Sequence, residues 1–138
     1  MSETLSKPRV LFPGTARGPL LRLSAPLSFW GGVNPLTGEI ILGSHPQRGR
    51  NVSGTVMALA DPIGSSSSSY VLLELIHNKV APAAILLGEA DAILIVGCLV
   101  AREMDYAPPP ILHVDRAILS ALPDGDILIA DDAISAAP

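Results

Sequence analysis

The hydrophobic positions of this chain form several short runs that are separated by turn residues. Leu21 and Leu23 alternate with Arg22, which is typical of a half-buried strand within the extended stretch from Gly18 to Phe29. The β-branched, alternating stretch "NVSGTVMALA" at residues 51–60 predicts another strand. Further strands are predicted at "EIIL" (39–42), "AAILL" (83–87), "PPPILHVD" (108–115) and "DGDILIADD" (124–132).

Two stretches favour helices. After a run of serines, Val71, Leu72, Leu75 and Ile76 have the spacing that builds one apolar helix face. The stretch "EADAILIVGCLVAREM" at residues 89–104 is too apolar for periodicity to distinguish a buried helix from a strand followed by a helix, and we favour the helix. The pattern therefore predicts an α/β chain with about six short strands and two or more helices.

Composition supports a single domain. The chain has 138 residues, of which 49% are hydrophobic, so it can bury a substantial core. Prolines and glycines in "KPR" and "FPG" break the pattern before residue 17, and the closing "AISAAP" is typical of a frayed end. We expect a loosely ordered lead-in at 1–16, the domain at 17–132 and a tail at 133–138.

The charge pattern argues against nucleic acid and membranes as partners. Only 16% of the residues are charged and the formal net charge is -4, which leaves no basic surface for phosphates or anionic lipid. The most apolar run, "AILIVGCLVA" at 92–101, is about half as long as a membrane-spanning helix. The N-terminus lacks the pattern of a secretory signal, so we expect a cytoplasmic protein.

The metal-binding residue types are few and scattered. Cys98 is the only cysteine, so the chain alone cannot form an internal disulfide or hold an iron-sulfur cluster on thiolates. His45, His77 and His113 lie far apart without a metal-binding spacing, and we interpret them as ordinary surface or core histidines. We expect no metal and no cofactor to be bound by this chain alone.

Five consecutive serines, Ser65 to Ser69, follow Gly64 directly before the apolar helix. One serine can cap a helix N-terminus, but capping does not explain five. The run is either an ordinary polar loop or a loop around a helix N-terminus, where free N–H groups and the helix dipole favour a carboxylate or an alkoxide. The second interpretation predicts an anion site without Lys or Arg.

A second unusual stretch is "LSFWGGVNPLTG", in which the only tryptophan, Trp30, precedes Gly31 and Gly32. Adjacent glycines allow a backbone to approach a ligand or another chain closely. Asn34 follows in a turn. Trp30 either borders a ligand here or packs into the core beside the turn.

These stretches together carry a resemblance. "LSFWGGVNPLTG", then "HPQRG" with "VSGTV", then "GSSSSSYVLLEL" and "APAAILL…ADAILIVG" occur in an order and spacing that resemble the small subunit of the aconitase X family. The resemblance covers roughly residues 18–114. It implies the swivelling β/β/α domain of aconitase and isopropylmalate isomerase, with a compact, barrel-like sheet core.

The resemblance also implies an activity and site residues. Enzymes of this family are dehydratases, in which a large subunit carries the iron-sulfur cluster and the small domain closes over a small carboxylate substrate. The serine after the glycine of a G-S-S-R-E motif acts as the base in aconitase-like domains, and this position is Ser65 here. The arginine of that motif is replaced by Ser67, which argues against a tricarboxylate substrate. We expect the substrate to be lined by Ser66, Ser67, Trp30, Gly31, Gly32, Asn34 and Gly64.

Several alternatives stay open. The family's dehydratases act on cis-3-hydroxy-L-proline or on mevalonate 5-phosphate. We favour hydroxyproline, because Trp30 could border a pyrrolidine ring and the serine loop offers no evident cation for a phosphate. The chain would then be one half of a heterodimer. A non-enzymatic anion-binding module is a second possibility, and a chain that only stabilises a partner through "AILIVGCLVA" is a third.

Overall fold

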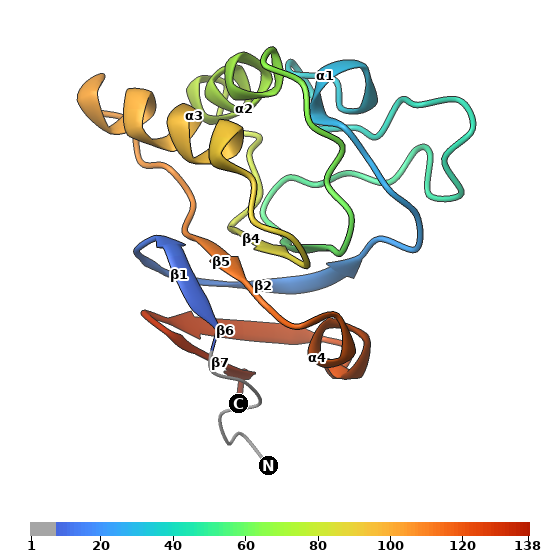
Figure 1. Ribbon diagram of the computed structural model, residues 1–138, viewed down its shortest axis with the longest axis vertical. Helices are drawn as coiled ribbons and strands as arrows, with labels where there is room; N and C mark the ends of the chain where they lie inside the picture. The colour runs from blue at the N-terminus through green and yellow to red at the C-terminus, as the bar shows by residue number, and fades with distance from the viewer. Residues whose placement is uncertain (1–7) are drawn as a thin grey trace.

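The fold is a curved seven-stranded sheet with helices on both faces (Figure 1), seen in a computed structural model that describes residues 8–138. The strands are β1 (Arg9–Phe12), β2 (Thr15–Arg22), β3 (Val56–Leu59), β4 (Ala84–Leu87), β5 (Ile111–His113), β6 (Asp126–Ala130) and β7 (Ala133–Ala136). The helices are α1 (Phe29–Gly32), α2 (Ser68–His77), α3 (Ala92–Glu103) and α4 (Arg116–Ala121). The sheet forms a half-barrel, which confirms the predicted mixed α/β class.

The strand order is β1-β5-β4-β3-β2-β6-β7. The four central strands, β2 to β5, run parallel to one another, whereas β1, β6 and β7 are antiparallel to their neighbours. Parallel strands require crossover connections, which α2 and α3 supply between β3, β4 and β5. The carboxyl ends of the parallel strands therefore meet along one edge of the sheet, where open α/β sheets commonly bind their ligands.

The central strands are apolar on both faces because both faces are covered. Met57 and Ile85 point into a core cluster beneath α2 and α3. Their neighbours Ala58 and Leu86 point the opposite way, into a second cluster formed with α4, β6 and β7. All eight residues of β3 and β4 are buried. Burial on both sides explains why these strands appear in the sequence as continuous apolar runs.

The helices α2 and α3 pack together above the sheet. The apolar face predicted for α2 is buried, and Gly97 of α3 lies against the backbone of Ser69, where an added Cβ would approach the carbonyl oxygen to 2.9 Å. Asp91 starts α3, because its Oδ1 atom accepts a 2.8 Å hydrogen bond from the N–H of Ile93. No helix among residues 8–138 has the length and apolar character needed to cross a bilayer.

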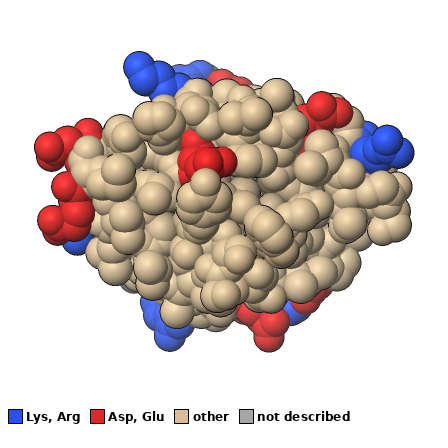
Figure 2. All heavy atoms as spheres, turned by 90° about the horizontal axis from the view of Figure 1, so that it is seen from above, with Lys and Arg blue, Asp and Glu red and all other residues tan. Residues whose placement is uncertain are grey.

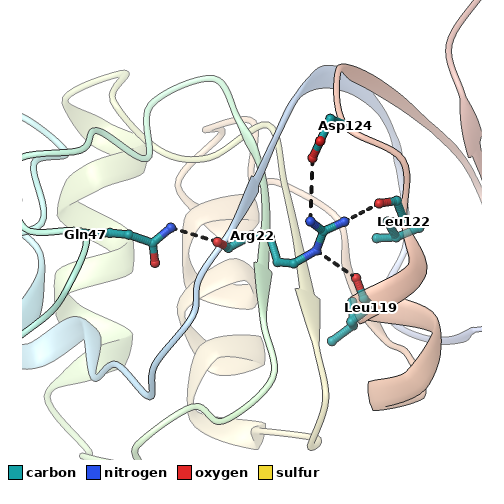
Figure 3. A network of polar contacts seen from close by, with 5 residues as sticks. All are labelled: Arg22, Gln47, Leu119, Leu122 and Asp124. Atoms are coloured by element: carbon teal, nitrogen blue, oxygen red, sulfur yellow. Dashed lines mark hydrogen bonds and ion pairs between the residues drawn. The ribbon is translucent and has the colours of Figure 1, made fainter.

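One arginine fastens α4 to the end of β2 (Figure 3). The Arg22 guanidinium donates to the carbonyl of Leu119 at 3.1 Å and to the carbonyl of Leu122, and it lies 3.6 Å from Asp124. A cation is favourable at a helix C-terminus, where carbonyl groups lack partners. The backbone carbonyl of Arg22 in turn accepts a 2.8 Å hydrogen bond from Gln47, which ties the long loop after α1 to the same strand.

The structure differs from the predicted elements at several places. Within the predicted lead-in at 1–16, residues 9–12 form β1 and β2 begins at Thr15; residues 1–7 lie outside the described part of the chain. The predicted tail contains β7, which pairs with β6. The segment "EIIL" makes only isolated bridges, at Glu39 and Ile40, and α4 was not predicted. The domain boundaries themselves stay a prediction.

Candidate functional site

The serine loop leads into α2 and is partly exposed. Ser65 is half-buried, its Oγ atom accepts a 3.3 Å hydrogen bond from the N–H of Ser67, and its carbonyl accepts one from Ser68 at 2.9 Å. Ser67 occupies the position before the helix but makes no capping hydrogen bond with its own side chain. Ser66 is exposed, and its carbonyl accepts from the Ser69 hydroxyl at 3.0 Å. Gly64 is also exposed and has open space around it.

Ser68 joins this loop to the tryptophan loop. Its side chain is buried, and its Oγ atom accepts a 3.2 Å hydrogen bond from the backbone N–H of Trp30 and lies 3.4 Å from the hydroxyl of Ser28. Two of the sequence stretches that carry the resemblance, the tryptophan loop and the serine run, are therefore neighbours in space. Sequence reasoning did not single out Ser68, because a buried serine and an exposed serine look alike within a run of five.

The tryptophan loop presents its aromatic ring to solvent. Trp30 is 56% exposed, which excludes the interpretation that it packs into the core. Gly31 has φ +77, a conformation that favours glycine, and nothing lies within 4 Å of its open side. Gly32, in contrast, is buried against Leu27, where a Cβ would come within 2.7 Å of a methyl group. Of these two glycines, Gly31 is thus the one that offers its backbone to an approaching molecule.

Asn34 has a structural role in the next turn. Its Oδ1 atom accepts a 2.9 Å hydrogen bond from the N–H of Leu36, and its backbone N–H donates to the carbonyl of Glu39 at 2.8 Å. This is the behaviour of an asparagine that builds its own turn. The Oδ1 contact orients its amide group toward the turn, and its predicted contact with substrate stays a prediction.

An open hollow of about 770 Å³ lies at the carboxyl ends of β3, β4 and β5, beside the serine loop. Gly64 lines the hollow, and Ser65 is the next residue in the chain. The other lining residues come from the segments that follow the parallel strands and begin α3 and α4: Pro62, Gly88, Glu89, Ala90, Asp91, Ala92, Ile93, His113 and Arg116. The sheet topology thus brings three distant segments together around one space.

The guanidinium in the wall of this hollow belongs to Arg116, which was not predicted from the sequence. Its Nη2 atom lies 2.5 Å from Asp61 and 3.8 Å from Glu89. The hydrogen bond from Arg116 holds the pKa of the Asp61 carboxyl below its ordinary value, and the same contact raises the pKa of the guanidinium. The signal that could have found it is its position, because Arg116 is a charged residue directly after the predicted strand at residues 108–115.

The histidines do not share a site. His45 is buried, and its two ring nitrogens contact the backbone of Ala25 and Gln47. His77 contacts the hydroxyl of Tyr106 at 2.7 Å, while His113 lies in the wall of the hollow, 3.2 Å from the Gly88 carbonyl. Each histidine has a separate local contact, as expected from their separation in the sequence.

The described residues do not fit an iron-sulfur cluster. Cys98 lies on the buried face of α3, and burial raises the pKa of its thiol to about 12, which disfavours the thiolate that binds iron. Among residues 8–138, no three His, Cys, Asp or Glu side chains gather closely enough to hold a metal ion. No chemical step is therefore assigned to a metal held by this chain.

The face over α1, α2 and α3 carries few charges. Figure 2 shows this face with most charged side chains at its edge and one acidic group near its centre. Within "AILIVGCLVA", Leu94, Gly97, Cys98 and Ala101 are buried, whereas Val96, Leu99 and Val100 are 40 to 49% exposed. The apolar run is thus partly core and partly surface.

Comparisons with known proteins converge on one family. A family model described as the aconitase X swivel domain matches residues 5–136. The chain is 50% identical over 97 residues to a protein of Pseudomonas aeruginosa named cis-3-hydroxy-L-proline dehydratase; the match covers 70% of this chain but only 17% of that relative. It is 42% identical to a protein of Methanothermobacter thermautotrophicus named phosphomevalonate dehydratase small subunit, covering 67% of this chain and 71% of the relative.

Solved structures agree with the sequence matches. The crystal structure of Thermococcus kodakaraensis aconitase X in its holo-form superimposes with a TM-score of 0.83 at 29% identity, over 96% of this chain and 98% of that one. A solution NMR structure of a UPF0107 protein gives a TM-score of 0.80 at 28% identity, over 98% and 97% of the two chains. Similarity therefore extends over nearly the whole fold.

Proposed function

Because this chain belongs to the aconitase X swivel-domain family, we propose that it is the small subunit of a two-chain dehydratase that removes water from cis-3-hydroxy-L-proline and gives 1-pyrroline-2-carboxylate. The observation that carries the proposal is the position of the serine loop. It leads into α2 beside an open hollow at the carboxyl ends of three parallel strands, and it contacts the exposed tryptophan loop through Ser68. Relatives named as dehydratases or as dehydratase small subunits support the reaction class.

In this proposal Ser65 is the base. The Ser65 alkoxide would take the proton from the carbon next to the carboxylate, the C–H electron pair would form a double bond to the neighbouring carbon, and the bond from that carbon to its hydroxyl would break. The leaving hydroxide would take a proton from an acid of the large subunit and depart as water. The resulting enamine would then tautomerise, with a proton moving from the ring nitrogen to the carbon that lost the hydroxyl, to give 1-pyrroline-2-carboxylate. A serine alkoxide is unfavourable at neutral pH and needs stabilisation. The N–H of Ser67, which already donates to Ser65 Oγ, and the positive end of α2 would supply it.

Other residues of the two loops would shape the site. Ser66, Ser67 and Gly64 are the neighbours of the base, and the exposed ring of Trp30 offers an apolar surface to a pyrrolidine ring. Gly31 leaves room for close approach. Gly32 and Asn34 are proposed to contribute indirectly, since their contacts hold the loop in place.

The proposal requires a large subunit. The chain spans about a sixth of the length of the Pseudomonas aeruginosa relative. It spans 71% and 86% of the lengths of the two archaeal relatives that are named small subunits. A hydroxyl leaves more readily when an electrophile is present, and we propose that the partner supplies it together with an iron-sulfur cluster. Ser65 and the partner's reactive groups would then face each other across the closed site.

Mevalonate 5-phosphate is the second candidate substrate. Relatives from Methanothermobacter thermautotrophicus and Methanocella arvoryzae are named phosphomevalonate dehydratase small subunits, with 42% and 36% identity. Against this substrate, the guanidinium in the hollow is already paired with Asp61 and lies near Glu89. A phosphate group would add about -1.5 to -2 charge beside these carboxylates.

The test is to co-express the chain with its large subunit and to assay both substrates. We expect turnover of cis-3-hydroxy-L-proline, and a loss of about 10²- to 10⁴-fold in kcat for Ser65→Ala, the usual contribution of a general base. The Ser65→Ala chain should still assemble with its partner in gel filtration. Ser53→Ala is the matched control, because Ser53 is exposed and lies in a different loop.

Two results would contradict the proposal. Full activity of the Ser65→Ala complex would show that Ser65 is not the base. Micromolar binding of a small carboxylate by the isolated chain, without any turnover in the complex, would favour the non-enzymatic anion-binding module. If the complex turns over mevalonate 5-phosphate but not cis-3-hydroxy-L-proline, the chain is still a dehydratase subunit but its proposed substrate is wrong.

A further inference from the structure

The charges around the hollow form a pattern that the serine loop does not explain. Arg116 is its one guanidinium, and Glu89 lies on the same wall with its carboxylate 3.8 Å from Arg116. Asp61 pairs with Arg116 from the loop after β3, and Asp91 is occupied as the cap of α3. Carboxylates therefore outnumber cations at this site. An environment of this kind disfavours an anion and suits a molecule that carries both charges.

Arg116 has N–H groups that are available to a ligand. Its contacts with Asp61 and Glu89 both use the Nη2 atom, which leaves Nε and Nη1 without a partner among residues 8–138. Its side chain is 49% exposed, so a ligand in the hollow can reach it. A guanidinium binds a carboxylate best through two parallel N–H groups. The Asp61 contact therefore positions Arg116 without blocking a second carboxylate.

The Glu89 carboxylate is also available to bind a ligand. Its side chain is 68% exposed, and 3.8 Å is longer than a hydrogen bond, so its oxygens are free to accept from an ammonium group. It follows β4 directly and lies in the wall that also contains Gly64. A positive and a negative side chain thus face the same space beside the serine loop.

We propose that Arg116 and Glu89 determine substrate specificity by binding the two charges of a cyclic α-imino acid, with Arg116 on the carboxylate and Glu89 on the ring ammonium. This inference rests on the proposed function, and it assigns the substrate specificity of the enzyme to these two residues. The carboxylate and the ammonium are attached to the same carbon atom, and that carbon loses the proton. Two contacts on its substituents would orient it toward Gly64 and Ser65.

The proposal makes a distinction between the two candidate substrates. An imino acid places its ammonium next to its carboxylate and is neutral overall, so it matches one guanidinium and one free carboxylate. Mevalonate 5-phosphate has no cation for Glu89 and would have to approach Asp61 and Glu89 with two anionic groups. Like charges that are held close together are unfavourable, most of all in a closed site.

Binding of two unreactive ligands to the assembled two-subunit complex tests this directly. L-Proline carries both charges, whereas cyclopentanecarboxylate has the same ring and carboxylate without the nitrogen. By calorimetry we expect Glu89→Gln to weaken L-proline binding about tenfold or more and to leave cyclopentanecarboxylate unchanged. Arg116→Gln should weaken both ligands, and Arg116→Lys should restore part of the affinity. Glu103→Gln, at the opposite end of α3, is the control for removing one negative charge.

The outcomes separate this inference from the proposed function. If the wild-type complex binds L-proline no more tightly than cyclopentanecarboxylate, or if Glu89→Gln affects both ligands equally, the inference is wrong. That conclusion holds even when the complex turns over hydroxyproline with Ser65 as base. Conversely, the expected binding pattern without any turnover would support the zwitterion site and contradict the dehydratase.

Discussion

Ser68 is a buried hydroxyl that holds two loops of the candidate site together. It is 1% exposed and holds the backbone of Trp30 next to the start of α2. Ser65, three residues earlier, is more exposed, and its Oγ atom accepts a 3.3 Å hydrogen bond from its own loop. Within one run of serines, the first is therefore partly exposed, whereas the fourth is buried and holds the tryptophan loop.

The buried hydroxyl of Ser68 should matter for stability. Ser68→Ala leaves the Trp30 N–H without its acceptor, and we expect the free energy of unfolding to fall by about 1–3 kcal/mol. Urea denaturation followed by circular dichroism measures the change. Ser66→Ala is the matched control, because Ser66 is exposed and should lose almost nothing. Equal losses in the two variants would contradict the assignment.

At the residue scale, sequence patterns found the right stretches but could not separate roles inside them. The serine run and Trp30 are visible in the chain, and both lie at the candidate site. Burial distinguishes Ser68 from Ser65 and places Trp30 in solvent, and burial depends on distant parts of the fold. Arg116 was missed because its importance comes from Asp61 and Glu89, 55 and 27 residues away in the chain.

At the scale of elements, the packing of α2 on α3 sets the position of the serine loop. The two helices approach closely at Gly97, where an added Cβ would lie 2.9 Å from the carbonyl oxygen of Ser69. A side chain here would push away the first turn of α2, which directly follows the loop that carries Ser65. The glycine thus links the contact between two helices to the geometry of the site.

We expect Gly97→Ala to destabilise the protein although alanine favours helices. The new methyl group would lie 2.9 Å from the Ser69 carbonyl oxygen, and overpacking of this kind costs about 1–3 kcal/mol. The midpoint of urea unfolding measures the loss. Gly43→Ala is the control, because open space surrounds Gly43. A Gly97→Ala chain as stable as wild type would show that α2 shifts without cost.

Helices were predicted correctly where the spacing of apolar residues, or a long apolar run, indicated them. Val71, Leu72, Leu75 and Ile76 are buried along α2 as their spacing predicts, and the helix favoured for residues 89–104 is confirmed as α3. The short helix α4 was missed because its six residues are too few for a period to show, and Arg22 fastens its end from another element. β1 and β7 were missed because they exist as strands only by pairing with β5 and β6.

At the scale of the whole molecule, the parallel sheet creates the hollow. The segments after β3, β4 and β5 meet at one edge of the sheet, and the ion pair between Asp61 and Arg116 joins the loop after β3 to α4 across this edge. The pair is half exposed, so its contribution to stability is small and depends on pH and salt.

The pH dependence of this pair has a definite sign. The folded-state pKa of Asp61 is lowered from 3.8 by Arg116, so the contribution is fully present above 3.8 and is lost as the pH falls through the lower folded-state value. We expect Asp61→Asn to be less stable than wild type at pH 7 and equally stable in strong acid, measured by urea unfolding across this range. Asp132→Asn, which removes one carboxylate from the turn between β6 and β7, is the control for the loss of one negative charge.

The amino-acid sequence by itself determined the local features of this protein: the apolar runs of β3 and β4, the amphipathic face of α2, and the run of serines at its start. These follow from spacing and residue type, which act over a few neighbours. Only the tertiary structure decided which serine is buried, that Trp30 is exposed, and that Arg116 shares a hollow with Glu89 and Gly64. The physical reason is that burial and charge pairing depend on strand order, and strand order is set by packing between residues far apart in the chain.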